Sequence, residues 1–179
     1  MAKAIVLLAP GFEEIEAAAI IDVLRRGGIE VTVAALGETR VPGAHDLSFV
    51  ADCRLKDVEH QSFDAVLLPG GMPGSRNLRD DVRVKALLQR QAEQGRQLGA
   101  ICAAPIALEA AGVLQGKRAT SYPGYDLPSA EYCEDRVVVD GNVVTSRGPG
   151  TAIEFALQWV TLLAGADQAA QLRQGMLVS

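Results

Sequence analysis

Short apolar runs that alternate with amphipathic segments constrain the fold of this chain more than any other feature. The run AIVLLA (residues 4–9) is continuously apolar and is followed by Pro10-Gly11, a pattern typical of a strand buried on both faces. Residues 13–28, EEIEAAAIIDVLRRGG, are rich in helix formers and end in two glycines, which favour the end of a helix. The β-branched run EVTVAAL (residues 30–36) predicts the next strand.

The alternation continues to the carboxyl end of the chain, with no linker, repeat or low-complexity segment to interrupt it. The further strands are predicted over 47–51 (one strand of a short hairpin), 64–71, 97–102 and the hairpin 136–146. The further helices are predicted over 80–95, 104–114, 150–165 and 167–174. This order predicts one α/β domain over residues 1–179, a three-layer sandwich with a mostly parallel sheet and helices on both faces.

Charge and cysteine content exclude several classes of function. The 179 residues carry a net charge of −5, so no basic field is predicted to attract nucleic acid. No apolar stretch approaches a membrane span, and acidic residues rather than a signal-peptide cleavage pattern follow the first run. We therefore expect a cytoplasmic protein. Three widely spaced cysteines and only two histidines predict neither a disulfide framework nor a metal site.

The stretch LGAICAAP (residues 98–105) predicts a reactive cysteine at a strand-to-helix turn. A nucleophile elbow needs small residues two positions before and after the nucleophile, and Ala100 and Ala104 occupy these places around Cys102. Pro105 fits the first turn of a helix. Because a helix N-terminus favours a thiolate, we expect the pKa of Cys102 to lie below the usual value of about 8.5. The alternative is a buried cysteine that packs at the end of a strand.

A nucleophilic cysteine usually needs a base, and the sequence offers few candidates. Both histidines, His45 and His60, precede Cys102 and lie outside the predicted strand-to-helix turns. Glu16 is a candidate, since on a helical wheel of residues 14–27 it falls on the apolar arc. A carboxylate there is costly unless protonated or paired, and a protonated one can donate a hydrogen bond to a thiolate. In the alternative, Glu16 lies in the first turn of the helix and reaches water.

The glycine-rich stretch LPGGMPG (residues 68–74) follows another predicted strand, and we expect residues 68–78 to form a loop. Its glycines allow backbone N–H groups to point into a site, and the N–H of Gly71 would form an oxyanion hole with that of Ala103. The alternative is a tight loop without chemistry. No G-x-G-x-x-G follows the first strand and no G-x-x-x-x-G-K-[ST] occurs, so nucleotide binding is not predicted.

Four stretches of the chain carry a family resemblance. They are, in chain order, GFEEIEAAAIIDVLRRGGIEVTVA, DAVLLPGGMPGSRNL, AICAAP and TSRGPGTAIEFAL. Together they resemble the ThiJ/PfpI superfamily, in the branch of the Parkinson-associated protein deglycase (DJ-one). The resemblance implies a flavodoxin-like fold and a homodimer without a cofactor. It also implies that Cys102 is the reactive, easily oxidised cysteine and that Glu16 is the protonated carboxyl beside it.

The resemblance extends to further site residues and to function. It implies that Gly70, Gly71 and Ala103 form the oxyanion segment and that Arg147 contacts substrate or anion. The implied activities are conversion of methylglyoxal or glyoxal and removal of their early adducts on proteins, so the partner is a small dicarbonyl or a glycated protein. The alternative is an oxidative-stress sensor or redox-regulated chaperone, in which oxidation of Cys102 is the functional event.

The chain departs from the best-known member of that branch at two positions. Tyr122 stands where that member has a histidine, and we expect Tyr122 to take part in catalysis by orienting substrate or water. The alternative is a partly buried aromatic side chain with an exposed hydroxyl. His45 stands where that member has an arginine that reaches the partner's site. His45 is therefore a candidate for a weaker anion contact of the same kind.

Overall fold

A seven-stranded sheet in the order β10-β11-β7-β6-β1-β2-β5 forms the centre of the protein, and the computed structural model describes all 179 residues. The strands are β1 (Lys3–Leu8), β2 (Glu30–Ala35), β5 (Cys53–Arg54), β6 (Ala65–Leu68), β7 (Gln97–Ile101), β10 (Val137–Asp140) and β11 (Val143–Ser146). Neighbouring strands are parallel except β10 and β11, which form the predicted antiparallel hairpin. The mostly parallel sheet is thereby confirmed.

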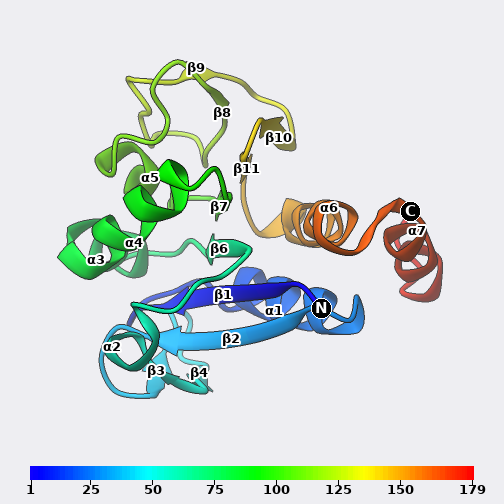
Figure 1. Cartoon of the computed structure of the whole chain (residues 1–179), viewed down its shortest axis with the longest axis horizontal. Helices are drawn as coiled ribbons and strands as arrows, with labels where there is room; N and C mark the ends of the chain where they lie inside the picture. Colours follow the sequence, from blue (N-terminus) through cyan, green and yellow to red (C-terminus); the bar gives the residue numbers. More distant parts are fainter.

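Helices cover both faces of this sheet (Figure 1). They are α1 (Glu14–Arg26), α2 (Leu55–Val58), α3 (Gly74–Asp80), α4 (Val82–Glu93), α5 (Pro105–Ala110), α6 (Ala152–Ala164) and α7 (Ala166–Gly175). In Figure 1, α3, α4 and α5 lie to the left of the strands, and α6 and α7 lie to the right. Helix α1 packs against α6. The three-layer α/β architecture is confirmed.

The first strand shows why its sequence is continuously apolar. Ala4, Val6 and Leu8 join one core cluster with side chains of α1 and α6, whereas Ile5 and Leu7 join a second cluster with side chains of α4 and α5. Successive side chains of a strand point to opposite faces, so a strand covered on both faces has no position for a polar residue. The sheet is buried between the two helical layers for this reason.

Several elements differ from the prediction. Residues 68–78 are not a loop throughout, because α3 begins at Gly74. The helix predicted over 104–114 is shorter, since α5 ends at Ala110 and Gly112 adopts a left-handed conformation with φ +75°. The short hairpin is present as β3 (Arg40–Pro42) and β4 (Ser48–Val50). The pair β8 (Arg118–Ala119) and β9 (Glu131–Tyr132) was not predicted, because each strand has only two residues.

The parallel strands bring distant segments of the chain to one edge of the sheet. Strands β1, β6, β7 and β11 run in the same direction and end at Leu8, Leu68, Ile101 and Ser146. In open α/β sheets, ligands bind outside the carboxyl ends of the strands. The candidate site residues follow these ends.

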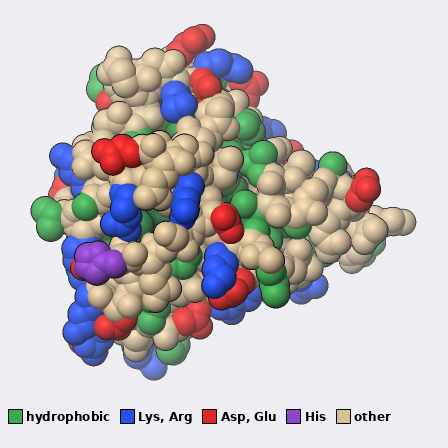
Figure 2. Space-filling model, viewed as in Figure 1, with side chains coloured by type: hydrophobic (Ala, Val, Ile, Leu, Met, Phe, Trp, Pro, Cys, Tyr) green, Lys and Arg blue, Asp and Glu red, His purple; other side chains and the backbone are tan.

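The outer surface shown in Figure 2 carries Lys and Arg side chains interspersed with Asp and Glu, without a continuous basic area on this face. Such a surface offers no single-sign field to a polyanion. None of the helices combines the length and the apolar character needed to cross a membrane.

Candidate active site

Cys102 lies at a strained turn between β7 and α5. Its backbone has φ 63°, in the left-handed region that non-glycine residues rarely adopt, and its side chain is buried, with 8% of the residue exposed. The Cys102 N–H donates to the carbonyl of Ser146 (2.9 Å), and its carbonyl accepts from the N–H of Tyr122 (2.8 Å). These two bonds hold the turn in the conformation that the elbow motif predicts.

Glu16 is completely buried on the first turns of α1 and faces this elbow. Its Oε2 accepts a hydrogen bond of 2.6 Å from the N–H of Gly70. Its Oε1 is buried without a hydrogen-bond partner, and the Glu16 carboxyl contacts the thiol of Cys102. The alternative in which Glu16 reaches water is wrong.

Burial raises the pKa of Glu16 to about 7. The Gly70 N–H and the contact with Cys102 oppose this shift by favouring the carboxylate, whereas the negative charge of Glu13 adds to it. Near neutral pH the Glu16 side chain therefore exists in both protonation states, as expected of a group that transfers protons.

Burial, together with the neighbouring Glu16 carboxylate, raises the pKa of the Cys102 thiol to about 12, while the N–H groups of Gly71 and Ala103 lower it. The expected lowering of this pKa is therefore wrong, because burial is the largest cause of the shift. Helix α5 has only six residues, so its dipole does not offset burial and a neighbouring negative charge. When Glu16 keeps its proton, the repulsion disappears and the carboxyl becomes a donor to the sulfur.

The two glycines of the LPGG stretch have different roles. The N–H of Gly70 is bonded to Glu16 and is not free for a substrate oxygen, whereas the N–H groups of Gly71 and Ala103 both face the sulfur of Cys102. A Cβ atom at Gly70 would lie 2.6 Å from Cβ of Cys102 and 2.7 Å from Oε2 of Glu16. Only glycine fits between the acid and the thiol.

Tyr122 reaches the elbow through its backbone, and its ring is 48% exposed. The ring lies over Gly148, where a Cβ atom would approach its Cδ2 atom to 3.3 Å. It also meets Tyr125 edge-to-face, with ring centroids 6.4 Å apart. The hydroxyl of Tyr122 makes no hydrogen bond within the chain, so it is free to bond to a ligand.

Arg147 follows Ser146, the residue whose carbonyl holds the Cys102 N–H. Its Nη1 donates to the carbonyl of Glu134 (3.4 Å), and its Nε is buried without a partner. Arg147 lines a pocket of about 610 Å³ together with Tyr125 and Tyr132. A guanidinium with an unused donor at a pocket wall can bind a carboxylate or another anion.

The histidines are not paired with Cys102. His45 places its Nδ1 3.1 Å from Oε2 of Glu14, at the start of α1. The Nε2 of His60 lies 3.5 Å from Oε1 of Glu59. The structure therefore brings Cys102, Glu16, Gly71 and Ala103 together and leaves His45 to a different group of side chains.

Two residues that support the site were not predicted. Glu13 caps α1, because its Oε2 accepts from the N–H of Glu16 (2.7 Å), and its own N–H donates to the carbonyl of Gly70 (2.8 Å). Glutamate is not among the preferred N-cap residues, so no capping signal marked it. The backbone carbonyl of Ser146 accepts the hydrogen bond from Cys102. A backbone contact does not depend on the side chain, so a single sequence cannot predict it.

Comparisons with known proteins identify the family of the chain. Residues 2–162 match the DJ-1/PfpI family. The protein dj-1beta of Drosophila melanogaster is 45% identical over 182 residues, which covers 99% of this chain and 97% of that protein. The crystal structure of Drosophila melanogaster DJ-1beta superimposes on this protein with a TM-score of 0.96 and 44% sequence identity. The superposition covers 99% of this chain and 98% of the Drosophila chain.

Two other similar proteins are named for a glyoxalase activity and for an oxidized state, respectively. The glutathione-independent glyoxalase DJR-1.2 of Caenorhabditis elegans is 39% identical over 170 residues, which covers 93% of this chain and 91% of that protein. A structure of oxidized DJ-1 from Toxoplasma gondii is 38% identical, with a TM-score of 0.94 over 99% of this chain and 98% of that one.

Proposed function

Because the chain belongs to the DJ-1/PfpI family, we propose that it is a cofactor-free, cysteine-dependent enzyme of the glyoxalase and deglycase type. Its substrates are methylglyoxal or glyoxal and the early adducts that these dicarbonyls form on proteins. The observation that carries the proposal is the buried Glu16 carboxyl beside the strained elbow of Cys102. The name of the C. elegans relative, a glutathione-independent glyoxalase, supports it.

In the proposed reaction, the Cys102 thiolate attacks the aldehyde carbon of methylglyoxal and forms a carbon–sulfur bond. The carbonyl electron pair moves to the oxygen, which the N–H groups of Gly71 and Ala103 stabilise until it takes up the proton of Glu16 and leaves Glu16 as a carboxylate. Glu16 then moves the proton of this carbon to the neighbouring ketone carbon through an enediol, which leaves a thioester of lactate. Water cleaves the thioester, releases lactate and restores the thiol.

This sequence of steps needs no external oxidant or reductant. The aldehyde carbon rises to the oxidation level of an acid, while the ketone carbon of the same molecule is reduced to an alcohol. With an early adduct, the protein's amine or thiol leaves as the sulfur of Cys102 takes its place on the carbon, and the same steps follow. The enzyme's thiol takes the role that an external thiol would otherwise fill.

Product analysis tests this proposal. We expect purified protein to form lactate from methylglyoxal and to remove adducts from a methylglyoxal-treated peptide. Both activities should be lost in Cys102→Ser and strongly reduced in Glu16→Leu, whereas Cys53→Ser serves as the matched control and should retain them. Lactate formation that is equal in wild type and Cys102→Ser would refute the proposed mechanism.

Tyr122 is proposed to orient substrate or water through its free hydroxyl. Tyr122→Phe removes one positioned donor and should lower kcat, by at most about 10²–10³-fold. Tyr125→Phe, which alters the neighbouring ring, is the control. Full activity in Tyr122→Phe would assign Tyr122 to packing alone.

A second candidate function is an oxidative-stress sensor or redox-regulated chaperone. The observation that favours it is the absence of a histidine beside Cys102, since His45 pairs with Glu14 and His60 with Glu59. The similar structure from T. gondii is of an oxidized DJ-1. Peroxide-dependent suppression of client aggregation, lost in Cys102→Ser, together with no turnover of methylglyoxal would favour this function.

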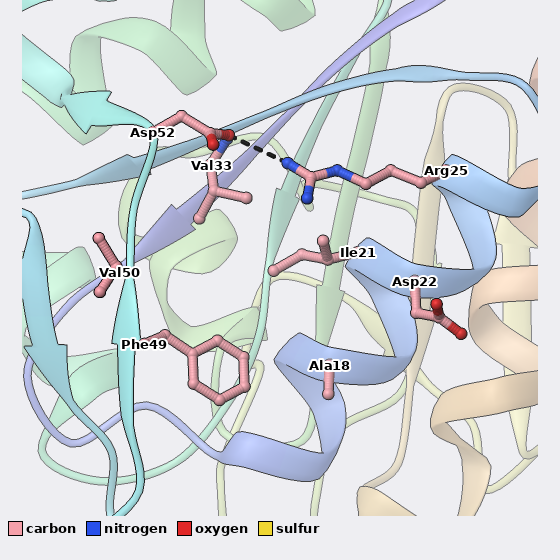
Figure 3. Close-up of a pocket in the computed structure, with 8 residues that line it drawn as sticks. All are labelled: Ala18, Ile21, Asp22, Arg25, Val33, Phe49, Val50 and Asp52. Atoms are coloured by element: carbon pink, nitrogen blue, oxygen red, sulfur yellow. Dashed lines mark hydrogen bonds and ion pairs between the residues drawn. The ribbon is translucent and has the colours of Figure 1, made fainter.

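We propose in addition that the protein acts in the cytoplasm as a homodimer. Its three cysteines are all free, as is usual in a reducing compartment. A shallow pocket of about 320 Å³ lies between α1 and β4, where Ile21 and Phe49 face each other beside Val50 (Figure 3). Ile15 and Leu47, from the same two regions, are exposed. An apolar surface of this kind is typical of a contact between subunits.

A further inference from the structure

We propose that Glu13, Glu14 and His45 form a binding site for a divalent metal ion of the zinc type. Each residue offers one ligand atom, and the three atoms lie within 4.8 Å of one another. The sequence predicts no such site, because His45 is separated from the two glutamates by about thirty residues. The fold joins them where the turn before β4 meets the start of α1, at the isolated bridge between Phe12 and Gly43.

Backbone N–H groups fix the orientation of both carboxylates. Oε2 of Glu13 accepts from the N–H of Glu16 (2.7 Å), and Oε1 of Glu14 accepts from the N–H groups of His45 (2.6 Å) and Leu47 (3.3 Å). In each carboxylate the other oxygen is turned toward the His45 ring. Metal ligands are commonly held in place by such outer hydrogen bonds.

The spacing of the ligand atoms suits a small tetrahedral ion. Nδ1 of His45 lies 3.1 Å from Oε2 of Glu14 and 3.9 Å from Oε1 of Glu13. Bonds of about 2.0–2.1 Å to a tetrahedral Zn²⁺ place ligand atoms roughly 3.3 Å apart. All three atoms lie within 4.8 Å of one another, so the Glu13 carboxylate must move toward His45 to reach this distance.

The charge of the cluster is not balanced by the protein. The side chains of Glu13 and Glu14 are 8% and 5% exposed, yet neither pairs with a lysine or arginine, and His45 is the one basic side chain beside them. Oε1 of Glu13 receives no hydrogen bond from the chain, and the nearest basic atom is Nδ1 of His45 at 3.9 Å. Buried carboxylates are stable when they are paired or coordinate a metal.

The donor set and its exposure indicate which ion would bind. One imidazole nitrogen and two carboxylate oxygens suit Zn²⁺, whereas Mg²⁺ and Ca²⁺ prefer oxygen ligands alone. The His45 ring is 72% exposed in the single chain, so the ion can enter from solvent before two chains associate, and it can take water as its fourth ligand. A bound ion would tie residues 43–47 to α1 without using Cys102.

Metal binding by the full chain tests this site. EDTA-treated protein is titrated with Zn²⁺ or Co²⁺ by calorimetry and visible spectroscopy. We expect one ion per chain, with equal affinity in wild type and Cys102→Ser, and tetrahedral Co²⁺ bands without a thiolate charge-transfer band. His45→Asn should weaken Zn²⁺ binding about tenfold or more, as should Glu14→Gln, which keeps a side-chain oxygen to accept from the N–H groups of His45 and Leu47.

His60→Asn is the matched control, because His60 is the other exposed histidine and also lies beside a glutamate. It should bind Zn²⁺ like wild type. Zn²⁺ at about 100 times its Kd should raise the Tm of wild type by roughly 5–10 °C and leave that of His45→Asn unchanged. Absence of binding to wild type, equal binding to His45→Asn, or a cobalt–thiolate band would each overturn the proposal.

Discussion

At the residue scale, Glu16 and Cys102 share surroundings that accommodate one negative charge but not two. The pKa of each group is raised by burial, and the pKa of Cys102 is raised further by the charge of Glu16. The thiolate therefore forms when Glu16 retains the proton. Reactivity belongs to the pair, and a change at Glu16 alters the chemistry of the sulfur as directly as a change at Cys102.

The first prediction concerns the order in which the cysteines oxidise. Mild peroxide should convert Cys102 to the sulfenic and then the sulfinic acid before it reacts with Cys53 or Cys133. Burial and Glu16 raise the pKa of Cys102, but the N–H groups of Gly71 and Ala103 favour charge on its sulfur. Burial and the charges of Asp52 and Asp57 raise the pKa of Cys53, where no N–H group opposes the shift. Peptide mass spectrometry after graded peroxide treatment measures the order, and earlier oxidation of either other cysteine would contradict it.

The second prediction concerns the dependence of stability on pH. The pKa of Glu16 is about 7 in the folded protein and 4.5 as its ordinary value. Between these values the unfolded chain loses the proton that the folded protein keeps, so raising the pH favours unfolding. The stabilisation is complete below pH 4.5 and is lost as the pH rises through 7, a change of about 3 kcal/mol.

Glu16→Gln carries no titrating group and supplies the comparison. Urea unfolding of both proteins in EDTA-containing buffer, from pH 4.5 to pH 8, should show the free energy of unfolding of wild type falling by about 3 kcal/mol relative to Glu16→Gln. Two parallel profiles would show that Glu16 is ionised throughout and has no role in proton transfer.

At the element scale, the turn after β6 and the turn after β7 meet so closely that Gly70 is confined between Glu16 and Cys102. Gly70→Ala should therefore push the two turns apart, cost about 1–3 kcal/mol in the free energy of unfolding and abolish turnover. Gly150→Ala is the control, because a Cβ atom there meets nothing within 4 Å. Denaturant unfolding and the lactate assay measure both effects, and unaltered activity in Gly70→Ala would contradict the described geometry.

The elements that the sequence predicts well are those with a long, regular pattern. The structure contains β1, β7 and α1 close to their predicted bounds. In each of them the buried positions must be apolar, so the pattern of apolar residues in the sequence marks the element. Helix α3 and the strands β8 and β9 are short and depend on tertiary contacts, so local pattern does not mark them. The elbow at Cys102 was predictable from its small neighbours, whereas the raised pKa was not, because it depends on how deeply the fold buries the thiol.

At the scale of the whole molecule, the exposed apolar side chains on α1 and β4 predict a dimer. Light scattering at micromolar concentration should give twice the mass of the chain. Val50→Asp, at a side chain of β4 that is 73% exposed, should shift the protein to monomer without unfolding it. Val82→Asp changes an equally exposed valine on α4 and should leave the dimer intact. A monomeric wild type would refute the prediction.

The hydrogen bond from Cys102 to Ser146 has a consequence for how the protein becomes active during folding. Its carbonyl comes from β11, whose parallel pairing with β7 joins the two ends of the segment 102–142. Parallel pairings of this kind join residues far apart in sequence and form slowly. A nascent or partly refolded chain thus contains the thiol but lacks the hydrogen bond to Ser146 that shapes its turn. In a refolding experiment, recovery of turnover should coincide with the last kinetic phase.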